Sequence, residues 1–165
     1  MEISGIALTT DSPNTFGRSM IDLVGATMTK NAAAQACKQA GVTPDEVNVV
    51  ELHDCFSSNE LICYEALGLC EEGKAGEAID RNDFTYGGRC VVNPSGGLIS
   101  KGHPLGASGV AQVAELCWQL RGMADKRQVN GAKIGMSHSL GLGGACVVGV
   151  YKKYRPDVSG RVRPD

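Results

Sequence analysis

The sequence predicts a layered α/β domain built around a mixed β-sheet. Three observations favour this fold class: strand-like and helix-like segments follow one another in the order β-α-β-α-β-β, the 165 residues suit one domain, and hydrophobic residues make up 42% of them. The formal net charge of −2 argues against a general nucleic-acid binder. No apolar run approaches the ~20 residues needed to cross a bilayer. We expect one domain over residues 1–154 and a flexible tail over residues 155–165.

The N-terminal part begins with a strand signal and continues into a helix. Residues 2–10 predict a strand, and residues 11–28 are expected to be an irregular lead-in. Thr29 is placed to cap a helix of small apolar residues that continues to Gly41, because glycine commonly ends helices.

A polar loop follows the second predicted strand. Residues 48–52 are rich in β-branched side chains and predict a short strand, which ends at residues 53–56, HDCF. Ser57 and Glu60 have the spacing of a capping box, so a helix is predicted from there to Gly68. Open α/β sheets place their active sites in loops of this kind, at the carboxyl ends of strands.

The second half of the chain holds one long predicted helix and two strands. Residues 70–100 are loop-rich, and a helix is predicted over about residues 106–121. We expect this helix to be buried on most sides because its apolar residues are so numerous; they include Val110, Val113, Ala114, Cys117, Trp118 and Leu120. Residues 132–138 and 145–151 predict two strands, which a glycine-rich turn at residues 141–144 joins.

Seven cysteines are present, at positions 37, 55, 63, 70, 90, 117 and 146. Their number is odd and no two have Cys-x-x-Cys spacing, which argues against a disulfide framework and against a zinc site. Most lie among apolar residues and are expected to behave as small core side chains. Free thiols indicate a reducing compartment inside the cell.

The three histidines, His53, His103 and His138, are the candidates for acid–base chemistry. Any one of them taken alone is more simply a loop histidine bonded to backbone. The surroundings of His103 argue for chemistry, because Gly102 allows close approach of a substrate and Pro104 fixes the chain behind it. The following helix directs the positive end of its dipole at this loop. A rigid histidine there can accept a thiol proton or donate to an oxyanion.

Residues 102–109 read GHPLGASG and match the G-H-P-x-G-A-[ST]-G signature of thiolases at every position. Most thiolases carry Asn-Glu-Ala-Phe in the upstream loop, whereas HDCF at residues 53–56 resembles thiolases of the sterol carrier protein 2/X type. Four stretches resemble that subfamily, at residues 51–56, 64–70, 93–97 and 114–122. The resemblance covers about residues 18–153. It implies the C-terminal half of a thiolase, a layered α/β fold with a mixed five-stranded sheet.

Thiolases cleave a 3-oxoacyl-CoA with a second CoA, or condense two acyl-CoA molecules in reverse. The resemblance therefore implies an acyltransferase with CoA and acyl-CoA as substrates, no bound cofactor and no metal. The family's nucleophilic cysteine belongs to the N-terminal half, so we expect the isolated chain to be inactive without that half or a nucleophile-bearing subunit. It also implies a dimer of the complete enzyme and a peroxisomal place in lipid or sterol side-chain metabolism, with the cytoplasm as the alternative compartment.

The same resemblance implies roles for single residues. His103 accepts the nucleophile's proton and helps to bind the thioester oxygen, and His53 completes that oxyanion site, directly or through water. Most thiolases move the α-carbon proton with a second cysteine near the C-terminus, where this chain has Ser139. Serine is far too weak an acid, so Cys55 is the implied substitute. Physical chemistry agrees, because a nearby histidine or oxyanion-hole dipoles can lower the pKa of a thiol toward neutrality. Gly141 supplies a backbone N–H to a second oxyanion hole.

Two other functions stay open. One is a thiolase-fold retro-aldolase acting on steroid side-chain CoA esters, although both catalytic loops are intact here and favour thiolysis. The other is a non-catalytic partner subunit. The glycines at residues 141–144 lie between two strands and open no helix, so they are not a dinucleotide-binding fingerprint.

Overall fold

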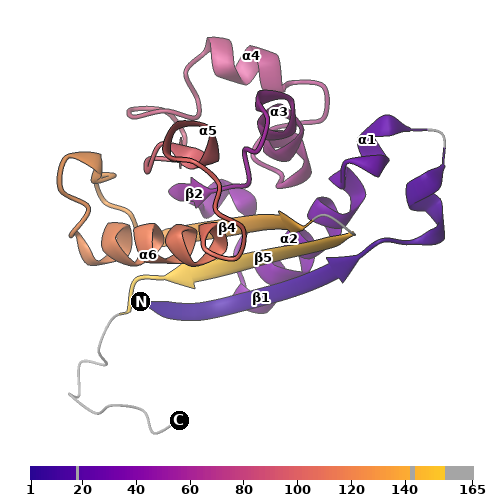
Figure 1. The fold of residues 1–165 in the computed structure, drawn as a ribbon. Helices are drawn as coiled ribbons and strands as arrows, with labels where there is room; N and C mark the ends of the chain where they lie inside the picture. The colour runs from indigo at the N-terminus through magenta and orange to yellow at the C-terminus, as the bar shows by residue number, and fades with distance from the viewer. Residues whose placement is uncertain (18, 142–143, 155–165) are drawn as a thin grey trace, which may run out of the picture.

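The computed structural model describes residues 1–17, 19–141 and 144–154, which form one sheet covered by helices (Figure 1). The mixed sheet has the strand order β1-β5-β4-β2-β3; the strands are β1 (Glu2–Thr10), β2 (Val49–Glu51), β3 (Val91–Val92), β4 (Ile134–Gly141) and β5 (Ala145–Lys152). The α-helices are α1 (Met20–Leu23), α2 (Ala26–Ala40), α3 (Ser57–Ala66), α4 (Ala75–Asp80), α5 (Gly97–Lys101) and α6 (Ser108–Arg121). Three short 3-10 helices are η1 (Pro13–Phe16), η2 (Pro44–Glu46) and η3 (Asp125–Arg127). The predicted layered α/β fold with a mixed five-stranded sheet is confirmed.

Strand direction brings three strand ends to one edge of the sheet. β2 runs parallel to β3 and to β4, with Val50 opposite Val92 on one side and opposite Met136 on the other. β5 runs antiparallel to both β4 and β1. The carboxyl ends of β2, β3 and β4 therefore meet at one edge, where open α/β sheets place their sites.

Helices cover both faces of the sheet. α2 packs along β1 and β5, whereas α6 packs on β4 and β2. Figure 1 shows α6 in front of the sheet and α2 behind it. The larger hydrophobic core lies on the α2 side and includes Ala36, Met136 and Val148. A smaller core that includes Val49 and Leu116 lies under α6.

The lead-in to α2 is more regular than the sequence predicts. The irregular segment expected over residues 11–28 is wrong, because it contains η1, α1 and the first turn of α2. α2 is capped by Gly25 at a φ of 91°, and Thr29 lies inside the helix and does not cap it. The predicted stop at Gly41 is confirmed, with a φ of 61°. Elements as short as α1 contain too few residues for a periodic signal.

The close approach of α2 to β1 depends on small residues. Ala32 and Ala36 have no exposed surface. A Cβ on Gly5 would collide with the Ala36 carbonyl oxygen and would lie 3.1 Å from the Ala40 nitrogen. Glycine at position 5 is what lets the backbone of the helix lie against the strand.

Short elements next to β2 also depart from the predictions. α3 begins at Ser57 as expected, but its N-cap is Phe56 and no capping box forms. Glu60 instead accepts a hydrogen bond of 2.7 Å from the Tyr64 hydroxyl. α4 and β3 lie within the stretch expected to be loop-rich. β3 has 2 residues, too few to show a strand pattern.

The burial predicted for α6 is wrong. Most of its buried side chains are polar; the buried set is Ser108, Gln112, Glu115, Leu116, Gln119 and Leu120. Part of the predicted apolar set lies on the outer side, where Val110 is 70% and Trp118 is 44% exposed, whereas Leu120 is buried and Val113 packs against the core under α6. An ion pair stabilises the buried Glu115 carboxylate, because a guanidinium nitrogen of Arg127 lies 3.0 Å from it. Helical periodicity shows which residues share a face but not which face the rest of the chain covers.

The C-terminal strands form the predicted hairpin. β4 and β5 pair from Ile134 opposite Lys152 to Gly141 opposite Ala145. Residues 142–143 and the tail predicted at residues 155–165 lie outside the described residues. Among the described helices, none is both long enough and apolar enough to span a membrane.

Candidate active site

Two histidines meet at the carboxyl edge of the sheet. His53 lies two residues after the end of β2, and His103 lies between α5 and α6. Their ring centroids are 4.8 Å apart, and the rings meet edge to face at 87°. His53 is buried and His103 is half-buried. The structure thus brings together the two residues that the sequence singled out for an oxyanion site.

Ser108 orients the His103 ring. The Ser108 hydroxyl lies 2.8 Å from His103 Nδ1 and donates its own proton to the Pro104 carbonyl oxygen at 3.2 Å. A hydroxyl has one proton to give, so in this arrangement Nδ1 carries the ring proton and donates it to Ser108. Nε2 then keeps its lone pair and is the basic nitrogen of His103.

The His53 peptide is held from both sides. Its carbonyl oxygen accepts a hydrogen bond of 2.5 Å from Asn59 Nδ2, and its N–H donates to His138 Nδ1 at 3.3 Å. Burial lowers the pKa of His53, the nearby His103 lowers it further, and Asp54 acts in the opposite direction. His53 is therefore neutral at physiological pH, with one ring N–H to donate to an oxyanion.

Asp54 joins the loop after β2 to α5. Its buried carboxylate accepts hydrogen bonds from the backbone N–H of Leu98 at 2.7 Å and of Ile99 at 3.4 Å. These N–H groups lie in the first turn of α5, where they have no partner within the helix. Gly97 makes room for the contact, because its φ is 61° and a Cβ there would collide with the carboxylate.

Glu51 makes a second link between the same two segments. Its side chain is fully buried and accepts hydrogen bonds from the Ser95 N–H at 3.1 Å and from the Ser95 hydroxyl at 2.7 Å. Lys101 Nζ lies 3.6 Å from the same carboxylate. Burial raises the pKa of Glu51, and Ser95 and Lys101 oppose that rise. Two carboxylates on either side of His53 in the sequence thus hold the segment that leads to His103.

Cys55 is half-buried in the loop that carries His53. Burial raises the pKa of its thiol, the backbone N–H groups of Phe56 and of Cys55 itself lower it, and Asp54 raises it; the net change is upward. The expectation that histidine or oxyanion-hole dipoles lower this pKa toward neutrality is therefore wrong for this chain. At neutral pH Cys55 is a protonated thiol that can give a proton.

Ser139 and Gly141 lie at the carboxyl end of β4. The Ser139 hydroxyl donates to Gln112 Oε1 at 2.7 Å, and Gln112 Nε2 donates to the His138 carbonyl oxygen at 3.0 Å. The Ser139 proton is therefore engaged with α6. Gly141 is exposed, and because residues 142–143 are not described, its backbone role stays a prediction.

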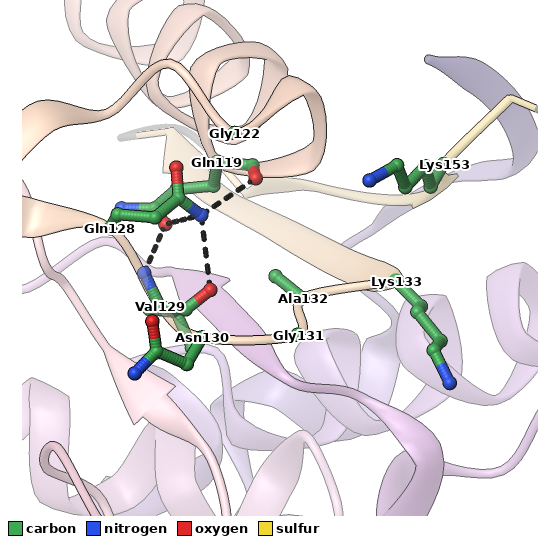
Figure 2. Close-up of a pocket in the computed structure, with 9 residues that line it drawn as sticks. All are labelled: Gln119, Gly122, Gln128, Val129, Asn130, Gly131, Ala132, Lys133 and Lys153. Carbon is green, nitrogen blue, oxygen red and sulfur yellow. Dashed lines mark hydrogen bonds between the residues drawn. The ribbon is translucent and has the colours of Figure 1, made fainter.

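A hollow of about 410 Å³ lies at the other end of β4. Figure 2 shows it between the end of α6 and residues 128–133, which lead into β4. The side chains of Gln119 and Gln128 bond to each other and to the Val129 backbone at 2.7–3.2 Å. This hollow is separate from the candidate site, which lies at the carboxyl end of the strand.

Sequence reasoning assigned no role to Glu51, Asp54 or Ser108, and it named His138 only as a candidate histidine. Ser108 lies inside the matched motif, five residues after the histidine it orients. The partners of Glu51 and Asp54 lie 44 to 50 residues further along the chain, which no local pattern shows.

Known proteins resemble this chain in sequence. The family model described as thiolase C-terminal domain-like matches residues 11–150. Sterol carrier protein 2 of Oryctolagus cuniculus is 57% identical over 164 residues, which make up 99% of this chain and 30% of that protein. An acetyl-CoA acetyltransferase of Methanothermobacter thermautotrophicus is 48% identical over 133 residues, 80% of this chain and 35% of that protein. The chain therefore spans about a third of the length of these relatives.

A solved structure named as an Ltp2-ChsH2(DUF35) aldolase resembles the chain with a TM-score of 0.77. The alignment covers 93% of this chain and 40% of that one, at 22% identity. A likeness at this identity shows the fold alone.

Proposed function

The chain belongs to the thiolase C-terminal domain-like family, and we propose that it carries the acid–base and oxyanion-binding groups of a 3-oxoacyl-CoA thiolase. In this proposal the nucleophilic cysteine stands on an N-terminal thiolase half or on a separate subunit, and CoA is a substrate. The contact of the His53 and His103 rings at 4.8 Å, with Nε2 of His103 left basic, is the observation that supports it most.

Each bond change in thiolysis then has a group to serve it. The nucleophile gives its proton to His103 Nε2 and attacks the 3-oxo carbon, whose oxyanion His53 and the protonated His103 stabilise. The bond between C2 and C3 breaks, its electron pair passes to C2, and the Cys55 thiol protonates C2 to release acetyl-CoA. CoA then attacks the acyl-cysteine and gives its proton to the Cys55 thiolate. The nucleophile leaves and recovers its proton from His103.

Two facts support Cys55 over Ser139 as the acid. The raised pKa keeps the Cys55 thiol protonated until the carbanion forms. The Ser139 hydroxyl is a far weaker acid, and its proton is engaged with Gln112. Gly141 remains a proposed N–H donor to the oxyanion of the acetyl-CoA enolate.

The apolar outer stripe of α6 is the proposed contact surface for the nucleophile-bearing half. It consists of Val110, Ala114, Cys117 and Trp118, which are exposed or partly exposed. We further propose a dimer of the complete enzyme. All seven cysteines are free thiols, which supports a reducing compartment, and the peroxisome is the one we propose.

The retro-aldolase alternative has weaker support. The aldolase structure is 22% identical and so shares only the fold. The contact between the His53 and His103 rings favours thiolysis over this alternative. A non-catalytic partner subunit remains an outcome of the experiment below.

Replacing His103 with alanine in a complete enzyme, with the nucleophile-bearing half present, tests the function. We expect acylation of the nucleophile by acyl-CoA to fall by ~10²-fold or more, because the base and an oxyanion donor are lost together. Single-turnover trapping of the acyl-enzyme measures this rate. Ser100→Ala is the matched control, since Ser100 is an exposed neighbour and should leave the rate unchanged.

Two outcomes would contradict the proposal. Near-normal acylation by the His103→Ala enzyme would make His103 structural. An unsubstituted complex that folds but never acylates would favour the non-catalytic subunit.

A further inference from the structure

His138 is a fully buried histidine that the thiolysis steps do not use. It lies in β4, on the α2 side of the sheet, and has no exposed surface. Its ring bridges two distant parts of the chain: Nε2 lies 3.0 Å from Thr29 Oγ1 in α2, and Nδ1 lies 3.3 Å from the backbone nitrogen of His53. His138 therefore links α2 to the loop that carries His53.

The partners of the ring determine its tautomer. A backbone N–H can only donate, so Nδ1 of His138 must accept from His53 and cannot carry a proton. The single ring proton then lies on Nε2 and is donated to Thr29 Oγ1. Burial, with a smaller contribution from His53, lowers the pKa of His138 to about 3, so the ring stays neutral.

The contacts close into a ring around the His53 peptide. Asn59 Nδ2 donates to the His53 carbonyl oxygen at 2.5 Å and lies 3.6 Å from Cys63 Sγ. Cys63 Sγ in turn lies 3.8 Å from His138 Nδ1. The N–H and the carbonyl of residue 53 are therefore both bonded to buried side chains, which fixes the direction in which its ring leaves the backbone.

We propose that His138 is a positioning residue for His53: its Nδ1 lone pair holds the His53 backbone N–H, and this keeps the His53 ring against the ring of His103. The role in catalysis rests on the proposed thiolase function. The role in geometry does not, because it concerns contacts within this chain alone.

Two substitutions separate positioning from simple core filling. In His138→Asn, the amide oxygen takes the place of Nδ1 and can still accept from His53, while the contact with Thr29 is lost. In His138→Gln, the longer amide reaches toward Thr29, while the acceptor beside His53 is lost. Gln is the closer match to histidine in volume. A core-filling role therefore favours Gln, whereas a positioning role favours Asn.

Nuclear magnetic resonance on the 165-residue chain tests the geometry. In the unsubstituted chain we expect Nδ1 of His138 to stay unprotonated from about pH 8 to about pH 5, with a scalar coupling to the His53 amide nitrogen. We expect the ring-to-ring nuclear Overhauser effect between His53 and His103 to persist in His138→Asn and to weaken in His138→Gln. A protonated Nδ1, or a ring contact equally strong in both variants, would overturn the proposal. The protonation of Nδ1 is measured on the unsubstituted chain, so it tests the proposal even if a variant fails to fold.

Kinetics of the complete enzyme provide the second test. We expect His138→Gln to lower kcat about tenfold or more with little change in KM, and His138→Asn to recover most of that loss, because misplaced catalytic groups slow the chemical step. Equal kcat values for the two variants would overturn the positioning role. An inactive unsubstituted complex would contradict the proposed function instead, and the resonance measurement would still decide the role of His138.

Discussion

The two helices that cover the sheet are built in opposite ways. α2 buries small apolar side chains such as Ala36, and Gly5 of β1 lets the helix backbone lie against the strand. α6 buries Gln112 and Glu115 and turns Val110 outward at 70% exposure. The sheet covers the apolar face of α2 within this chain. On the α6 side, apolar residues of the outer helix face stay exposed, and the loops of the candidate site lie nearby.

The two helices therefore contribute differently to the stability of the chain and to its association with another surface. A helix with an apolar inner face contributes to the free energy of unfolding through burial. A helix with an apolar outer face gains that contribution only when another surface covers it. Substitutions on the α2 face should therefore change the stability of the chain, and substitutions on the outer face of α6 should change its association.

Gly5→Ala should strongly destabilise the packing of α2 on the sheet. The added Cβ would meet the Ala36 carbonyl oxygen, so α2 must shift from β1, at a cost of about 3 kcal/mol. Urea unfolding measures the loss. Gly76→Ala is the matched control, because a Cβ in α4 meets nothing within 4 Å and should stabilise the helix by about 0.5–1 kcal/mol. Equal effects of the two substitutions would mean that α2 does not pack tightly against β1.

The buried His138 should lower the free energy of unfolding at acid pH, by less than the loss expected for Gly5→Ala. Its folded-state pKa is about 3, whereas an unfolded histidine has a pKa of about 6.5. Stability from the neutral ring is complete above pH ~6.5 and is lost as the pH falls toward 3, because only the unfolded chain takes up the proton. The loss by pH ~5 should be about 2 kcal/mol.

Comparison with His138→Asn isolates this contribution. The variant should lack that loss, so urea unfolding at about pH 7.5 and about pH 5 should show a weaker pH dependence than in the unsubstituted chain. Carboxylates such as Glu51, whose pKa is raised by burial, contribute equally in both proteins. Subtracting one pH dependence from the other therefore removes their contribution. The same pH dependence in both proteins would contradict the buried neutral histidine.

The outer stripe of α6 should give the smallest change in stability. Val110→Gln and Trp118→Gln should each alter the unfolding free energy by less than about 1 kcal/mol, because Val110 is 70% and Trp118 is 44% exposed. Both should weaken association with the nucleophile-bearing half, as measured by sedimentation of the two parts. Leu116→Ala on the inner face of α6 is the contrast, with an expected loss of about 2–5 kcal/mol. Unchanged association in both outer variants would place the contact surface elsewhere.

The sequence predicted well where the signal is local. The strand at residues 2–10, the stop at Gly41 and the C-terminal hairpin follow from short patterns and are confirmed. The proximity of His53 and His103 followed from a family motif, since 50 residues separate them in the chain and periodicity alone could not join them.

Features that depend on distant partners were missed. The apolar count of α6 could not reveal that polar residues of this helix are buried too, because the partner of Glu115 is Arg127 in the next segment. The raised pKa of Cys55 depends on burial, which the motif does not report. His138 looked like a loop histidine because its partners lie in α2 and in the loop after β2.

Deuterium exchange at the α-carbon of acetyl-CoA tests the proposed thiolase chemistry most directly. We expect Cys55→Ser in the complete enzyme to abolish exchange while the nucleophile is still acylated, because acylation uses His103 and not Cys55. Ser139→Ala should exchange at close to the normal rate, since the Ser139 proton is engaged with Gln112. Normal exchange in Cys55→Ser together with its loss in Ser139→Ala would contradict the assignment and place the acid on β4.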